Sequence, residues 1–212
     1  MMTKTATLAK PKTAKPAAPP LRDRQREQTR EAIFEGVMAV LGSGEMIDVS
    51  YPAVALAAGI SERTIYRHFP DLESLFDAFW PWFVEHLGLS GYSHTREEIA
   101  TNPARVFAVF DQHAGLVRAL IASKVGRTAR DRGNVPRKAA FHAAIEDMAG
   151  AKVSPEHMRM LAAASYALYS GYGWASMRDF WNIGGDEAGH IASKAIEWMV
   201  EGYKAELKRR AK

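Results

Sequence analysis

The sequence feature that most constrains the fold is a pair of short helical patterns joined by a tight turn, between residues 50 and 69. Ser50 and Pro52 suit the first turn of a helix, because a serine hydroxyl can accept a hydrogen bond from a free amide and proline has no amide hydrogen to leave unpaired. Gly59 lies in the turn, where the absence of a Cβ permits the backbone to reverse. Ser61 then caps a second helix, expected over residues 62–69.

The second short helix divides into two faces. Ile65 and Phe69 are four residues apart and therefore point the same way, into a core. The outward face carries hydrogen-bond donors and a phenol: Arg63, Thr64, Tyr66, Arg67 and His68. Such a helix suits the major groove of DNA, where donors and methyl contacts read base edges; the alternative is a solvated helix in an ordinary bundle. The expected apolar face of the first short helix is Val54, Leu56 and Ala57.

The whole pattern resembles a known family. Residues 57–76 read AAGISERTIYRHFPDLESLF and follow a helical stretch, REAIFEGVMAVL, at residues 30–41. Together they resemble the DNA-binding domain of the TetR family of bacterial transcriptional regulators, over about Arg22 to Phe79. The resemblance implies an all-α homodimer whose C-terminal part binds a small-molecule effector and releases double-stranded operator DNA. One position departs from the family, because Leu72 stands where members commonly have a phosphate-contacting lysine.

The residues expected to contact DNA follow from the outward face and the two helix starts. They are Ser50, Tyr51, Ser61, Arg63, Thr64, Tyr66, Arg67 and His68. Arg63 and Thr64 are expected at base edges and Tyr66 at a phosphate or a thymine methyl. Ser50 and Tyr51 would lie at the phosphate or groove edge. A dimer would present two such helices to a pseudo-palindromic operator.

Charge is distributed unevenly along the chain. Residues 1–30 hold eight lysines and arginines and two acids, whereas the remainder holds 20 basic and 22 acidic residues. This basic end predicts a polyanionic partner and salt-dependent binding. Residues 1–20 lack acids and aromatics and are expected to be a disordered arm, either a DNA-tracking segment or a simple solubilising tail.

Three regions are expected: the 1–20 arm, a helix-turn-helix DNA-binding domain at 21–70, and a helical effector-binding and dimerisation domain at 71–212. The first helix is expected over 21–41, with Ile33, Val37 and Leu41 on its buried face. In the C-terminal part, Asn102-Pro103 is expected to open a helix and the basic segment 126–136 to be a solvated surface. Two long helices, 155–181 and 186–208, are expected to form the homodimer interface.

Aromatic side chains from several helices of the C-terminal part form a candidate effector pocket. They are Trp82, Phe83, Phe107, Phe110, His113, Phe141, Tyr166, Tyr169 and Trp174. Pockets between helices are commonly lined this way, although aromatic residues at helical spacing also form ordinary cores. Both interpretations stay open.

No catalytic, cofactor-binding or metal-binding pattern is found in the sequence. The chain has no cysteine, which excludes thiol nucleophiles and thiolate zinc sites, and the histidines show no metal-ligand spacing. No apolar run is long enough to span a bilayer, so a cytoplasmic, nucleoid-associated protein is expected. A ligand-responsive regulator, most simply a repressor, is therefore favoured over two alternatives: a ligand-independent architectural DNA-binding dimer and a ligand-binding or enzymatic module with a vestigial helix-turn-helix.

Overall fold

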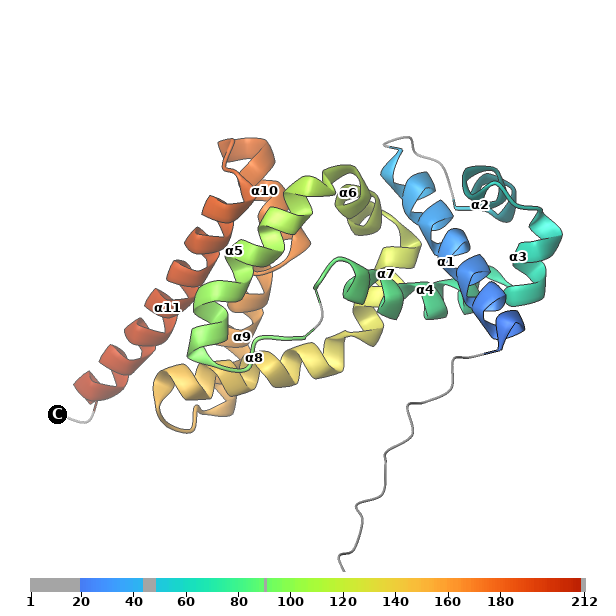
Figure 1. Ribbon diagram of the computed structural model, residues 1–212. Helices are drawn as coiled ribbons and strands as arrows, with labels where there is room; N and C mark the ends of the chain where they lie inside the picture. Colours follow the sequence, from blue (N-terminus) through green and yellow to red (C-terminus); the bar gives the residue numbers. More distant parts are fainter. Residues whose placement is uncertain (1–19, 44–48, 90, 211–212) are drawn as a thin grey trace, which may run out of the picture.

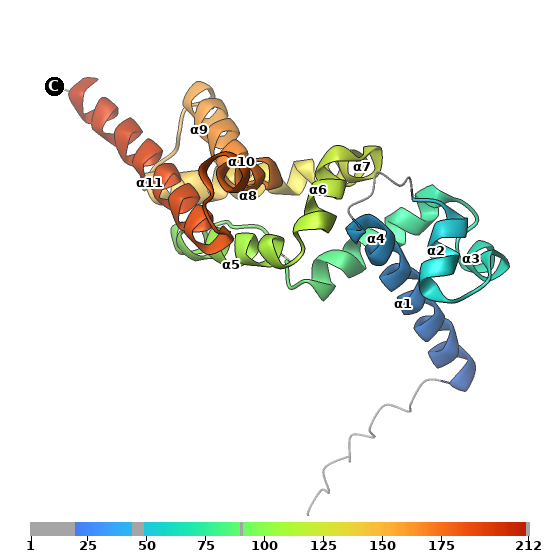
Figure 2. The ribbon, with the colours of Figure 1, turned by 90° about the horizontal axis from the view of Figure 1, so that it is seen from above.

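The computed structural model describes residues 20–43, 49–89 and 91–210 of the 212-residue chain. Within these ranges the fold is all-α, as predicted, with eleven helices and no strand (Figure 1). Helices α1 to α4 lie at one end of the molecule and α5 and α8 to α11 at the other, with the short α6 and α7 between them (Figures 1 and 2). The expected arm at residues 1–20 lies outside the described residues except for its last member.

The helix bounds are α1 Leu21–Gly42, α2 Tyr51–Ala58, α3 Glu62–His68, α4 Leu72–His86, α5 Arg96–Gln112, α6 Ala114–Ala122, α7 Lys124–Arg132, α8 Asn134–Ala149, α9 Pro155–Leu168, α10 Gly171–Trp181 and α11 Gly185–Arg210. None of these helices is long and apolar enough to cross a membrane.

The N-terminal end has a core rich in aromatic rings. Ile33, Val37 and Leu41 of α1 are buried as predicted. Phe34 contacts both Phe79 of α4 and the C-cap Phe69 of α3, with ring centroids 5.9 and 5.7 Å apart. The inward side of α1 therefore holds the other three helices of this end around one cluster.

Helix α2 packs against α1 with a different face from the one predicted. Leu56 is 86% exposed, and Ala57 is exposed too, whereas Val54 and Ala55 are the buried apolar side chains. Gly36 of α1 makes this contact close, because a Cβ there would lie 3.0 Å from the Val54 carbonyl oxygen. The expected apolar face is confirmed for Val54 and was wrong for Leu56 and Ala57, because so short a helix buries only the residues that meet α1.

The second half is organised on the crossing of α5 and α11, which lie side by side (Figure 1). Gly185 and Gly189 of α11 meet the α5 backbone directly, and a Cβ at Gly189 would collide with Pro103 and Ala104. Pro103 is buried in the interior of α5, so the prediction that it opens a helix was wrong. The helix instead begins after Thr95, whose hydroxyl accepts from the Glu98 amide in a capping box.

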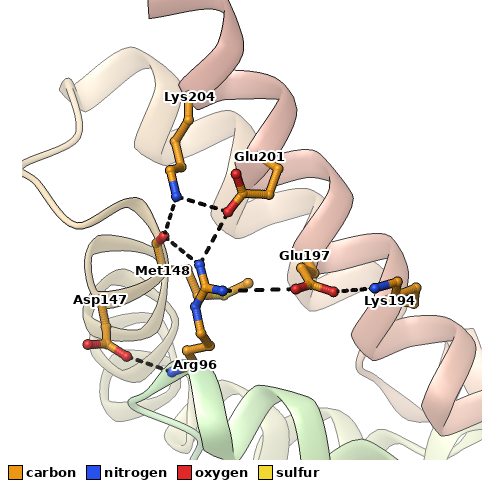
Figure 3. Close-up of polar contacts among 7 residues, drawn as sticks. All are labelled: Arg96, Asp147, Met148, Lys194, Glu197, Glu201 and Lys204. Atoms are coloured by element: carbon orange, nitrogen blue, oxygen red, sulfur yellow. Dashed lines mark hydrogen bonds and ion pairs between the residues drawn. The ribbon is translucent and has the colours of Figure 1, made fainter.

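A polar cluster ties the start of α5 to α8 and α11 (Figure 3). The Arg96 guanidinium donates to Met148 O at 3.0 Å and to Glu201 Oε1 at 3.2 Å, while its backbone amide donates to Asp147 Oδ2 at 2.7 Å. Lys204 reaches the same Met148 carbonyl at 3.4 Å. Arg96 is half exposed, so its main effect is to satisfy orphan carbonyls at the end of α8.

The last third differs from the two long helices predicted. The first of them is broken into α9 and α10 at Tyr169, and the Ser170 hydroxyl caps the second piece by accepting from the Gly173 amide at 3.1 Å.

The segment at 126–136, expected as a solvated surface, lies largely in helices α7 and α8. On α11, Trp198 is 66% exposed, while Ile196 and Val200 are buried.

Candidate nucleic-acid interface

The turn between α2 and α3 is built by a left-handed glycine. Gly59 has φ 65°, and the next amide, that of Ile60, donates to Ala55 O at 3.0 Å. This arrangement satisfies carbonyls at the end of α2 and reverses the chain, because only glycine adopts this conformation without strain. The turn sets the relative direction of the two helices as the sequence predicted.

Ser61 begins α3 in the expected way. Its hydroxyl accepts from the Thr64 amide at 3.2 Å and lies 2.9 Å from the Thr64 hydroxyl. Ser61 therefore has a structural role as N-cap, whatever it does towards DNA. Ser50 is the N-cap of α2 but makes no capping hydrogen bond, contrary to the prediction.

The two faces of α3 are separated as predicted. Ile65 and Phe69 are buried in the N-terminal core. Arg63, Tyr66 and Arg67 are exposed, with Tyr66 56% exposed, and Thr64 is half-buried. A helix end with two guanidinium groups and a phenol directed to solvent can donate to base edges and to phosphates.

Tyr51 does not lie at a groove edge as expected. It is 5% exposed, and its hydroxyl donates to Phe69 O at 2.8 Å. Its ring meets that of Tyr66 edge-on, with centroids 4.5 Å apart. Burial, then the nearby Asp71 carboxylate and Tyr66, raise the pKa of Tyr51 to about 12. Tyr51 thus fixes the end of α3 from behind, a role that the spacing of the sequence did not show.

His68 is less available than predicted for a phosphate contact. Its Nδ1 atom is buried and has no hydrogen-bond partner among the described residues. Burial lowers the pKa of the imidazole, and the cationic Arg67, Arg26 and Arg30 lower it further. His68 is therefore neutral near pH 7 and can offer a phosphate only a neutral donor.

Arg30 of α1 lies against the same end of α3. Its guanidinium is 5.2 Å from the Phe69 ring centroid and 5.5 Å from that of Phe34. The Arg30 side chain therefore packs on the aromatic core. Arg22, Arg24 and Arg26 are exposed.

The start of α4 is occupied by its own acid. Asp71 Oδ1 accepts from the Ser74 amide at 2.7 Å, and the Ser74 hydroxyl completes a capping box. The Asp71 and Glu73 carboxylates therefore oppose the attraction of a phosphate to the amides at this helix end.

A family model for bacterial regulatory proteins of the tetR family matches residues 33–79. The match spans the buried half of α1, the whole of α2 and α3, and half of α4. Residues 33–79 thus belong to a DNA-binding domain of the tetR family. The match indicates a DNA-binding transcriptional regulator with a helix-turn-helix, and the matched stretch coincides with the geometry described above. No curated protein and no solved structure shows a significant match to the chain.

The aromatic residues expected to line an effector pocket fall into two groups. Trp82 and Phe83 lie in the N-terminal core beside Phe34 and Phe79. Six others form a continuous run of ring contacts, in the order Trp174, Phe110, Phe107, Tyr169, Phe141 and Tyr166. His113 is half-buried at the junction of α5 and α6. A pocket lined by these side chains stays a prediction.

A cavity of about 940 Å³ lies between α8 and α9, and of the nine expected residues only Phe141 and Tyr166 line it. Its other walls include the cationic side chains of Arg137, Lys138 and Arg159, which no aromatic pattern in the sequence indicates. Among the described residues no three histidine, aspartate or glutamate side chains are grouped to hold a metal ion.

Proposed function

We propose that this TetR-family protein is a homodimeric, ligand-responsive repressor that binds a pseudo-palindromic operator and is released by a small molecule. The observation that carries the proposal is the divided surface of α3. Its inner face is fixed by Ile65, Phe69 and the Tyr51 hydrogen bond, and its outer face presents Arg63, Tyr66 and Arg67. A rigidly seated helix with exposed donors is suited to reading base edges.

Base and phosphate contacts are assigned by position on α3. Arg63 and Thr64 lie in the first turn, where recognition helices meet base edges, and Arg67 lies in the last turn, nearer the backbone. Tyr66 supplies a phenol for a phosphate or a thymine methyl. Ser50 is half-buried at the start of α2 and is assigned a phosphate.

The dimer is assigned to the exposed apolar side chains of the last helices. These are Met160, Tyr172, Phe180, Trp181, Ile191 and Trp198. Phe180 and Trp181 end α10, and Ile191 and Trp198 lie on the outer side of α11. A monomer rarely exposes so many large apolar groups on neighbouring helices, which supports a self-complementary interface.

Response to a ligand requires a connection between the two ends, and α6 supplies one. Gly115 packs on Gly42 at the end of α1, with a would-be Cβ 3.1 Å from the Gly42 carbonyl oxygen. On the other side of α6, Arg118 binds Asp179 of α10 through two hydrogen bonds of 2.6 Å. A displacement of α10 would therefore be transmitted through α6 to α1. The proposal needs a two-state coupling of this kind.

The test is a selection of binding sequences from random duplex DNA, followed by fluorescence anisotropy on the enriched duplex. We expect paired half-sites about one helical turn apart and an affinity that falls as salt rises. Arg63→Ala should weaken binding by about 1–3 kcal/mol and relax the preference at one base pair of each half-site. Arg127→Ala removes an exposed arginine of α7 and should change nothing. Enrichment of no sequence would refute the proposal.

The ligand-independent dimer remains the second candidate, because most of the expected pocket aromatics are packed in cores. Phe107 and Trp174 are fully buried. DNA release in the same anisotropy assay distinguishes the two functions, since a ligand-independent protein would keep its operator with any bound small molecule.

A further inference from the structure

The structure contains a cationic groove that the DNA-binding role of α3 does not explain. It lies between α8 and α9 and has a volume of about 940 Å³, a size suited to one small organic ligand. Its lining from α8 is Asn134, Arg137, Lys138, Phe141, His142 and Glu146, and from α9 it is Pro155, Met158, Arg159, Ala162, Ala163 and Tyr166, with Val153 from the loop between them.

The floor of the groove is apolar. Phe141 and Met158 are buried members of the core between α8, α9 and α11. Ala162 and Tyr166 pack against that core and meet the groove on their other side. The small side chains of Ala162 and Ala163 leave open the space that larger residues on α9 would fill. An apolar body of aromatic or aliphatic character would therefore lose water on entering the groove.

The walls carry an excess of positive charge. Arg137, Lys138 and Arg159 line the groove, and within the described part of the chain none of them has a carboxylate partner. The one acidic side chain in the lining, Glu146, is already paired with Lys152 at 3.0 Å. The groove thus has a net positive charge beside an apolar floor, which suits a ligand with both an anionic group and an apolar body.

Arg137 is held in position at this groove. Its guanidinium lies 5.7 Å from the Tyr92 ring centroid and 5.4 Å from that of Tyr166, and it donates to the Tyr166 hydroxyl at 3.4 Å. None of these contacts, and no carboxylate among the described residues, neutralises its positive charge. An arginine fixed between two aromatic rings is preorganised to bind a carboxylate or a sulfonate at low entropic cost.

We propose that this groove binds small amphiphilic anions, that is, molecules with one acidic group on an aromatic or aliphatic body. The inference names the class of effector and so rests on the ligand-responsive function proposed above. It places the effector between α8 and α9, at the end of the run of aromatic rings where Phe141 and Tyr166 line the groove.

The experiment uses two fluorescent probes with the same arylamine body. These are 1-anilinonaphthalene-8-sulfonate, which is an anion, and N-phenyl-1-naphthylamine, which is neutral. We expect the full-length protein to bind the anion at least about tenfold more tightly at low salt, with the preference falling as salt rises. The double variant Lys138→Gln, Arg159→Gln should lose about tenfold in affinity for the anion and less than about twofold for the neutral probe.

A matched control removes one lysine and one arginine elsewhere. Lys124→Gln, Arg127→Gln changes two exposed residues of α7 that do not line the groove, and it should leave both affinities unchanged. Ala163→Trp fills the groove from an exposed position and should abolish high-affinity binding of both probes. Far-ultraviolet circular dichroism and thermal unfolding establish that each variant is folded.

Equal affinity for the two probes, or an equal loss in the α7 control, would overturn the proposal. So would anion binding that appears only when the protein is diluted to monomers, because a second copy would then occupy the groove. Probe binding is measured without DNA and operator binding without probe. Failure of the groove assignment is therefore distinguished from failure of the DNA-binding function.

Discussion

The two ends of the molecule keep their helices together by opposite means. Between α1, α3 and α4 large rings, among them Phe34, Phe79 and Phe83, fill the space between the backbones, whereas α2 approaches α1 closely at Gly36. Where α5 crosses α11 there is almost no space, because Gly185, Gly189 and Ala192 bring the two backbones into contact. Packing between α1, α3 and α4 depends on large side chains, whereas packing at the α5–α11 crossing depends on small ones. The same kind of substitution should therefore have opposite consequences at the two ends.

The largest effect is expected where volume is removed from the aromatic core. Phe79 is 1% exposed and touches the rings of Phe34, Phe76, Trp82 and Phe83. Phe79→Ala should cost about 3–5 kcal/mol of unfolding free energy. Urea denaturation measures it, and operator affinity should fall with the folded fraction. A loss below about 1 kcal/mol would contradict the claim that ring volume holds this end together.

The next effect comes from adding volume to the α5–α11 crossing. Gly189→Ala places a methyl group against the backbone of Pro103 and Ala104 and should destabilise by about 1–3 kcal/mol. Gly202 lies on the same helix with nothing within 4 Å of a would-be Cβ. Gly202→Ala should instead stabilise by up to about 1 kcal/mol, because alanine has the higher helix propensity. If both substitutions had the same sign in thermal unfolding, the close contact would be refuted.

A smaller effect separates the two tyrosines behind and in front of α3. Tyr51→Phe removes the hydrogen bond to Phe69 O and should cost about 0.5–1.5 kcal/mol of stability. Tyr66→Phe removes an exposed hydroxyl and should leave stability within about 0.5 kcal/mol while weakening DNA binding. Chemical denaturation and anisotropy on the same pair of variants provide the check. An intact Tyr51→Phe protein with lost DNA contacts would restore the groove-edge assignment of Tyr51.

The smallest effect is a pH dependence of the N-terminal end. The pKa of His68 is lowered from its ordinary value of 6.5 because the charged imidazole would be buried among arginines. The unfolded chain therefore binds this proton more readily, so stability is fully present above about pH 6.5 and declines as pH falls towards the folded-state pKa. His68→Gln should make the unfolding free energy less dependent on pH between about 7 and 5. An unchanged slope would show that His68 is free to charge.

Sequence reasoning was strongest where a local rule governs a local structure. The glycine turn, the Ser61 cap and the buried pair Ile65 and Phe69 follow from backbone conformation and helical period, and all three are confirmed. The family resemblance over this part is confirmed by the matched residues 33–79.

Sequence reasoning failed where tertiary contacts choose among equivalent local options. Tyr51 has a polar hydroxyl group, which suits a surface contact. It is a core residue only because the Phe69 carbonyl lies where it can accept a hydrogen bond from this hydroxyl. Asn102-Pro103 is a pattern that indicates a helix start. The helix has already begun at Arg96, however, where Thr95 is the N-cap. The break at Tyr169 depends on the Ser170 cap, one weak signal within a long helical pattern. The groove between α8 and α9 joins residues from two helices whose pairing no local pattern encodes.

The contact of backbones at the α5–α11 crossing has a mechanical consequence. Two helices whose main chains touch over Gly185 and Gly189 have no intervening side chains that could change rotamer and let one slide past the other. The two helices behave as one rigid unit. Asp111 stabilises one end of this unit by accepting hydrogen bonds from the Gly185 amide at 2.7 Å and from the Trp174 indole at 2.8 Å. Any conformational change in this half of the protein must then occur in the shorter helices around this rigid unit. The hinge positions are therefore α6, α7 and the α9–α10 break.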